Sequence, residues 1–317
     1  MIFRKNDFVT HPKQDATVAK LNFGIGIVVE NQRGDMVDVF FEKKGRRMLY
    51  QMSLIPLKKI RDPGDVRAFL ENILVTEPKK KGSRRKPIPD QLDLFLKRFD
   101  GGIRGEILDV NEREYKVQKC DDFKSLLNED DFQALINDNK WTELGKRISK
   151  THNINLLSKF ELIKLSDVLK DKDVIKEISK ALFSFLYGSD ELKIRFESYA
   201  KILGNYELDK WPIITVPLFL RFPEKYISIK PTMTKEAAEN FCFNIQYDSK
   251  INWLTFSKVQ EFAQYMTVML NNEPNEQLHP RDMIDIQTIM WCTFANGWTD
   301  ENISDAKKEI ELAKEKE

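Results

Sequence analysis

Two acidic residues, Asp282 and Asp285, lie three positions apart at the start of the segment RDMIDIQTIMW. If this segment is a helix, the two carboxylates share one face of its first turn, where the helix dipole favours their charged forms. A carboxylate in such a place can activate a water or stabilise a sugar cation, which is the logic of glycoside hydrolysis. An acid in a first turn also stabilises a helix without any chemistry, so Asp282 and Asp285 are candidate catalytic residues with a structural alternative.

The surrounding stretch, residues 227–291, interleaves basic and aromatic residues. Cations neutralise phosphates and flat rings stack on bases, so this mixture suits a groove for nucleic acid. Tyr247 and Trp253 are the candidate walls of a pocket for a flipped base. The candidate phosphate contacts are Lys230, Thr232, Lys235, Lys250 and Arg281. A packed helical core with a solvated rim would have the same composition, and buried tryptophans are common in cores.

The charge is unevenly distributed along the 317 residues. The whole chain carries a net charge of +1, but residues 1–100 carry +8 and the remainder carries −7. A basic N-terminal third next to a mildly acidic body suggests a docking module attached to a differently specialised domain.

Several chemistries lack their residues in this sequence. There is no G-x-x-x-x-G-K-[ST] loop for a nucleotide, and the three histidines, His11, His152 and His279, have no metal-ligand spacing. Three widely spaced cysteines indicate neither a disulfide framework nor a zinc site. We therefore expect no metal and no cofactor. No apolar run is long enough to cross a bilayer, so a cytoplasmic protein without membrane contact is expected.

A metal-dependent nuclease is a further alternative. Asp90 or Asp100, followed by Glu114 and Lys116, formally matches a P-D…E-x-K set that binds a divalent cation. That set needs its E-x-K on a strand, whereas NEREYKVQKCDDFKSLL has helical spacing, which places Glu114 and Lys116 on different faces.

The first 60 residues show the alternation of short strands, with turns at NQRGD and KKGRR. The order Phe8–Pro12, Gly24–Val28, Val37–Phe41 and Gly45 resembles the small SH3/tudor-like barrels of bacteria, which are related to CarD-type domains and to the C-terminal module of some repair helicases. The resemblance implies docking on duplex DNA or on a DNA-processing protein, without catalysis. The basic hairpin Lys43, Lys44, Arg46 and Arg47 is its candidate DNA contact, or only a solvated tip.

Residues 61–90 join the two parts. A short helix is expected in DVRAFLENIL, followed by the exposed basic segment EPKKKGSRRKPIP. Its candidate phosphate contacts are Lys79, Lys80, Lys81, Arg84, Arg85 and Lys86, and the alternative is a solubilising linker.

Residues 91–317 have apolar positions at helical spacing and predict an all-helical domain. The succession of FDGGI, EREYK, IKPTMTKEAAE and RDMIDIQTIMW is similar to a family of bacterial proteins with no settled activity. The predicted fold is α+β, with an SH3-like barrel at 1–60, a helix and basic linker at 61–90 and the helical domain at 91–317. We expect a protein that acts on duplex DNA in repair or anti-phage defence, as a metal-free DNA glycosylase. The alternative is a non-catalytic adaptor for DNA or for a DNA-processing protein.

Overall fold

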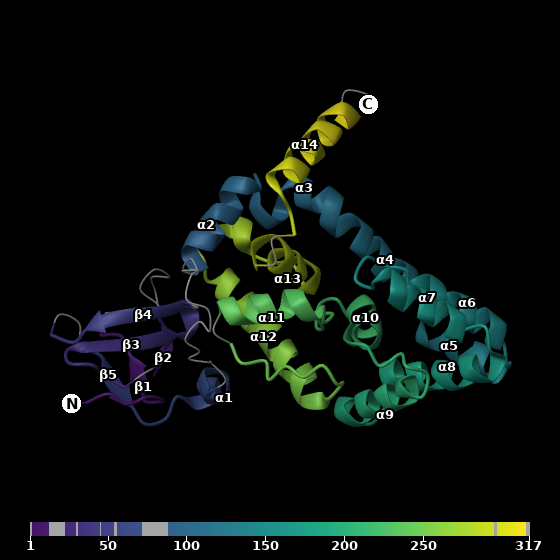
Figure 1. The fold of residues 1–317 in the computed structure, drawn as a ribbon, viewed down its shortest axis with the longest axis horizontal. Coiled ribbons are helices and arrows are strands. Elements are labelled where there is room, and N and C mark those ends of the chain that lie inside the picture. The colour runs from purple at the N-terminus through teal and green to yellow at the C-terminus, as the bar shows by residue number, and fades with distance from the viewer. Residues whose placement is uncertain are drawn as a thin grey trace.

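The computed structural model describes residues 2–12, 23–29, 31–44, 46–53, 56–71, 88–241, 243–294 and 297–314. A small curled sheet lies at one end of the molecule and a larger helical body forms the rest (Figure 1). The coarse prediction of an α+β fold, with strands first and helices after, is therefore confirmed.

The sheet is antiparallel throughout, and its five strands follow the order β4-β3-β2-β1-β5. The strands are β1 Phe8–Thr10, β2 Ile25–Val28, β3 Met36–Phe41, β4 Arg46–Gln51 and β5 Lys58–Ile60. The expected turn at NQRGD is present before β3, where Arg33 bridges to Met36 and Gly34 has a φ of 58°. Glycine suits this position because a left-handed backbone strains other residues.

The two faces of the sheet are buried against different partners. Val37, Val39 and Phe41 of β3 point into a small core within the sheet, together with Val9 and Tyr50. Phe8, Ile27, Val29 and Phe40 belong instead to the main core of the helical body. The ring of Phe40 lies 6.1 Å from that of Tyr265 in α12 (Trp253–Asn271). The division into domains stays a prediction, but the sheet and the body share one core.

The helical body is built from many short helices. After α1 Arg67–Glu71, they are α2 Ile88–Arg98, α3 Glu106–Leu108, α4 Glu114–Leu126, α5 Glu129–Asn137, α6 Trp141–His152, α7 Lys159–Val168, α8 Lys172–Tyr187, α9 Leu192–Gly204, α10 Trp211–Arg221, α11 Pro231–Asn240, α12, α13 Met283–Ile289 and α14 Asp300–Lys314. Two π-helical turns interrupt the α-helical hydrogen-bond pattern: η5 Asp109–Arg113 before α4 and η7 Met290–Phe294 after α13. Such turns are rare and are frequently found at functional sites.

Local sequence explains where several helices start. Asn128, Asp171 and Asn252 each accept a hydrogen bond from the first turn of the helix that follows. Ser158 and Glu161 form a reciprocal capping box at the start of α7. These side chains satisfy backbone N–H groups that would otherwise have no partner.

The apolar segment KWPIITVPLFLRF forms α10, and residues 211–220 are all buried. This segment therefore runs through the core of the helical body. In Figure 1, α10 and α13 lie inside the body, while α14 projects from it. None of the helices in the described ranges is long and apolar enough to cross a lipid bilayer.

Candidate functional site

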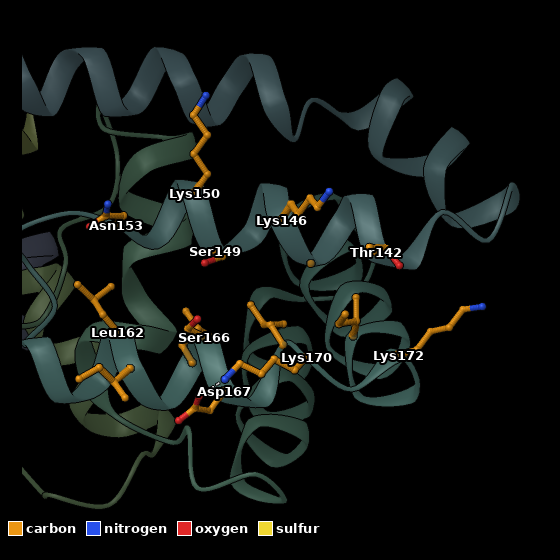
Figure 2. A pocket seen from close by; sticks show the side chains of 15 residues that line it. Thr142, Lys146, Ser149, Lys150, Asn153, Leu162, Ser166, Asp167, Lys170 and Lys172 are labelled. Atoms are coloured by element: carbon orange, nitrogen blue, oxygen red, sulfur yellow. Dashed lines mark hydrogen bonds and ion pairs between the residues drawn. The ribbon is translucent and has the colours of Figure 1, made fainter.

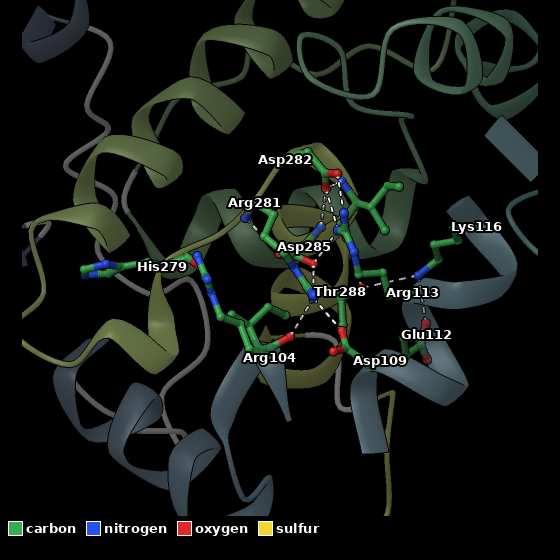
Figure 3. Close-up of polar contacts among 12 residues, drawn as sticks. Arg104, Asp109, Glu112, Arg113, Lys116, His279, Arg281, Asp282, Asp285 and Thr288 are labelled. Atoms are coloured by element: carbon green, nitrogen blue, oxygen red, sulfur yellow. Dashed lines mark hydrogen bonds and ion pairs between the residues drawn. The ribbon is translucent and has the colours of Figure 1, made fainter. Parts of the chain in front are cut away.

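The residues singled out at 281–285 lie in an ionic network, in which Asp285 is buried while Asp282 and Arg281 are partly exposed (Figure 3). Arg113 of η5 reaches across to α13 and grips Asp282 with both Nη atoms, at 2.8 and 2.7 Å. The same guanidinium donates to Asp285 Oδ1 at 2.8 Å. Burial alone would lower the pKa of Arg113, but the hydrogen bond to Asp282 and the charges of both aspartates outweigh it and raise that pKa.

Asp285 has its acceptor positions filled. Its side chain is 1% exposed and also receives the backbone N–H, Nε and Nη2 of Arg281, at 2.8, 2.8 and 3.1 Å. Arg281 in turn donates to Asp109 Oδ1 at 2.6 Å. A carboxylate with four donors has no lone pair left for a water. The contacts therefore give Asp285 a structural role, and its catalytic assignment stays a prediction.

Asp282 is the N-cap of α13. Its Oδ1 accepts the backbone N–H groups of Ile284 and Asp285, at 3.0 and 3.3 Å. The helix at RDMIDIQTIMW is thus confirmed, and so is the position of both acids at its start. Helix capping together with the ion pair to Arg113 accounts for these contacts of Asp282, and its catalytic assignment stays a prediction.

A pocket lies beside this network, between the two π-helical turns. Its volume is about 190 Å³, which is smaller than typical sites for drug-sized molecules. Segments far apart in the chain meet here, because its lining residues are Glu112, Tyr115, Lys116, Asn155, Leu156, Lys230, Met233, Gln287 and Trp291. We call it the Trp291 pocket.

Glu112 is the carboxylate of the Trp291 pocket. One oxygen accepts from Lys116 Nζ at 2.8 Å and the other from Trp298 Nε1 at 2.8 Å. Lys116, itself 2% exposed, also lies 3.4 Å from Thr288 Oγ1. Glu112 directly precedes Arg113 in η5, so the ionic network that fixes Arg113 also fixes the backbone that carries Glu112.

Two rings border the pocket. Lys230 Nζ lies 5.2 Å from the centre of the Trp291 ring, within the range of a cation–π contact. A Cβ atom at Gly297 would overlap the indole, so a glycine there lets the backbone pack against Trp291. Burial, together with the nearby charge of Glu112, raises the pKa of Tyr115, although a side-chain hydrogen bond with Asn155 opposes that shift. Tyr115 is thus a neutral donor.

Gln287 brings an unfilled acceptor to the pocket wall. Its Nε2 donates to the carbonyl of Ser228 at 3.3 Å, but its Oε1 accepts nothing from the described part of the chain. The residue is 1% exposed. Buried polar atoms are nearly always satisfied, so an unpartnered oxygen on a residue that lines the pocket is unusual.

The structure brings only some of the predicted residues together. Lys230 borders the Trp291 pocket, whereas Arg281 is held in the ionic network. Tyr247 lies elsewhere, under Lys235, whose Nζ is 4.8 Å from its ring centre. Trp253 is partly buried and packs against the core residues Phe196 and Phe256. Thr232 and Lys250 are exposed and do not line the Trp291 pocket.

Most of the predicted N-terminal DNA contacts cannot be placed from the residues that the structure describes. Lys79, Lys80, Lys81, Arg84, Arg85 and Lys86 lie outside the described residues, as do the side chains of Lys44, Arg46 and Arg47. Lys43 is half-buried and lines a hollow that residues at the start of α1 and on α12 also line. These contacts stay predictions.

The nuclease alternative gains no geometric support. Glu114 and Lys116 lie on α4, where Glu114 is exposed and Lys116 is buried, as helical spacing predicted. The described residues contain no group of three or more His, Cys, Asp or Glu side chains that could hold a metal ion.

Sequence reasoning missed Glu112, Tyr115, Asn155 and Gln287. The first two lie in the segment considered for a nuclease, and Gln287 lies within RDMIDIQTIMW, but no motif links them. Comparisons with protein-family models, curated proteins and solved structures found no match for the chain. The function must therefore be argued from the site.

Proposed function

We propose that this protein binds duplex DNA and takes a single extrahelical base into the Trp291 pocket. The observation that carries the proposal is the make-up of that pocket: an indole, a carboxylate and an unfilled amide acceptor around a space of about 190 Å³. Proteins that flip a base read it by stacking on rings and by hydrogen bonds to its edge.

Each wall has a part in this proposal. Trp291 offers a ring for stacking, and Gln287 Oε1 accepts an N–H from the base edge. Asn155 and Tyr115 supply further hydrogen-bonding groups. Lys230 is half-buried at the pocket, so its ammonium group can meet the phosphate of the flipped nucleotide.

We further propose that the pocket removes the base by hydrolysis, with Glu112 in the role first predicted for Asp282 and Asp285. A water attacks C1′ of the deoxyribose as the bond from C1′ to the base nitrogen breaks. Glu112 takes the proton of the water and returns it to the departing base nitrogen, and the carboxylate stabilises the positive charge that develops on the sugar. Glu112 is suited to this role because it lines the pocket, whereas Asp285 is enclosed by arginine donors.

The N-terminal sheet is proposed to be the SH3-like docking module. The return of β5 to pair with β1, after the consecutive pairs from β1 to β4, supports a barrel-like closure. The basic hairpin and the segment 79–86 would then grip phosphates in a salt-dependent manner. Repair or defence within the cytoplasm suits such an arrangement, because the three cysteines are not spaced as a disulfide framework.

Binding is tested with two fluorescent duplexes, one fully paired and one with a single mismatch. A mismatched base is cheaper to flip, so the protein should prefer that duplex. Trp291→Ala should remove the preference, at roughly 1–3 kcal/mol for one lost base stack, and should leave binding to the paired duplex intact. Tyr247→Ala is the matched control, since Tyr247 lies outside the pocket. No duplex binding at low salt would refute the proposal, and an unchanged preference in Trp291→Ala would refute the role of the pocket.

Excision is tested separately, by incubating the protein in EDTA with duplexes that carry modified and damaged bases. Alkali-labile abasic sites are the expected product. Glu112→Gln should abolish them, whereas Glu114→Gln, an exposed neighbour on α4, should not. Mismatch binding without abasic sites for any modification would leave a base-binding protein and refute the hydrolysis.

A further inference from the structure

A second hollow lies on the helical body, between α6 and α7, and is bounded at one end by the start of α8 (Figure 2). It has a volume of about 900 Å³. Ser149 of α6 and Ser166 of α7 lie on facing sides of the gap. We call it the α6–α7 groove.

The lower part of the α6–α7 groove is apolar. Leu165 and Leu169 are buried beneath it, and Gly145 lets α6 approach Ile175 of α8 closely. Ile163, which also lines the groove, is 59% exposed. Three positions earlier on α7, and so on the same side of the helix, Phe160 is 85% exposed. Phe160 and Ile163 therefore give the outer side of α7 an apolar edge next to the groove, which a partner can cover.

The rim of the groove is positively charged. Four lysines, Lys146, Lys150, Lys170 and Lys172, line it, and all are exposed. The one acidic residue in the lining is Asp167, which pairs with Lys170 at 2.7 Å. A ligand with negative charge would complement this rim.

We propose that the α6–α7 groove binds an amphipathic helix of a partner protein, with leucine-like side chains on one face and acidic side chains on its flanks. Helices lay their apolar face into grooves between other helices and anchor there at intervals of three and four residues. The apolar floor and Ile163 match such a face, and the lysine rim matches the acidic flanks. Nucleic acid fits less well, because no aromatic ring lines the groove to stack on a base. This inference is independent of the Trp291 pocket.

The test uses a fluorescein-labelled synthetic peptide of about 14 residues, or four helical turns. It carries leucines at helical spacing and glutamates elsewhere. The full-length protein should bind this peptide and should ignore both a scrambled version and a version with lysine in place of glutamate. Lys146→Glu combined with Lys150→Glu should weaken binding at least about tenfold, and so should Ile163→Ser. Lys193→Glu, an exposed charge reversal on α9, should have no effect.

Three outcomes would overturn the proposal. The first is equal binding of the acidic peptide and its lysine version. The second is binding that neither Ile163→Ser nor the double lysine variant weakens. The third is displacement of the peptide by duplex DNA together with weaker DNA binding by the double lysine variant, which would make the groove a path for nucleic acid. Circular dichroism of each variant confirms that it is folded.

Discussion

The sharpest test of the ionic network is Asp285→Asn, because it separates a structural aspartate from a catalytic one. The side chain is 1% exposed and receives donors from both Arg113 and Arg281. Asparagine has nearly the same shape but no charge, and its amide group would turn a donor toward an arginine. Breaking a buried ion pair by removing one partner costs roughly 3–5 kcal/mol. Here Arg113 and Arg281 each lose one of their two carboxylate partners, because Asp282 and Asp109 stay in place.

Urea unfolding, followed by circular dichroism and by tryptophan fluorescence, measures this loss. Asp282→Asn should cost less, roughly 1–3 kcal/mol, because asparagine still caps α13 and only the charged fork with Arg113 is weakened. Asp300→Asn is the surface control. Its partner is Arg98 and its side chain is 93% exposed, so its cost should stay within about 0.5 kcal/mol. If Asp285→Asn unfolds at the same urea concentration as the wild type but loses base excision, then Asp285 is catalytic and our structural reasoning is wrong.

Two further predictions concern His152 and Gly297. Burial lowers the pKa of His152 to about 4 from an ordinary 6.5. Between these two pH values the unfolded chain binds a proton at this histidine and the folded chain does not. The free energy of unfolding should therefore fall by roughly 3 kcal/mol as the pH falls from 6.5 to 4. Urea midpoints measured across this pH range should fall less steeply with falling pH in His152→Leu than in the wild type. An identical pH dependence in both proteins would contradict the burial of His152. Gly297→Ala should displace Trp291, because a Cβ atom at 297 overlaps the indole. Near-ultraviolet circular dichroism should show the change. Gly204→Ala is the control, because a Cβ atom at 204 has room. An unchanged spectrum together with an unchanged mismatch preference in Gly297→Ala would contradict the packing described for Trp291.

Local sequence patterns predicted much of the secondary structure. Alternation predicted the strands, and the spacing in RDMIDIQTIMW predicted a helix with Asp282 and Asp285 at its start, because both depend on neighbours within a few positions. The burial of residues 211–220 follows from composition in the same way, since an almost continuous apolar run leaves no polar face for solvent.

The candidate site was not readable in the same way. Glu112 and Trp291 line the same pocket although they lie far apart in the sequence. Arg113 and Asp285, which pair with each other, are 172 positions apart. A charged residue in a helix does not reveal its partner, so the two aspartates looked available for chemistry. The π-helical turns that border the pocket also follow from no local sequence motif.

The shared core between sheet and body has a consequence for how two binding events would combine. Phe40 and Ile27 belong to the core of the body, so the sheet is held in one orientation instead of moving on a tether. For sites joined by a flexible linker, the first contact only raises the local concentration of the second, and linker length sets the gain. Because the sheet packs rigidly on the body, the distance and the angle between the sheet and the Trp291 pocket are fixed. A ligand that reaches both must match that geometry.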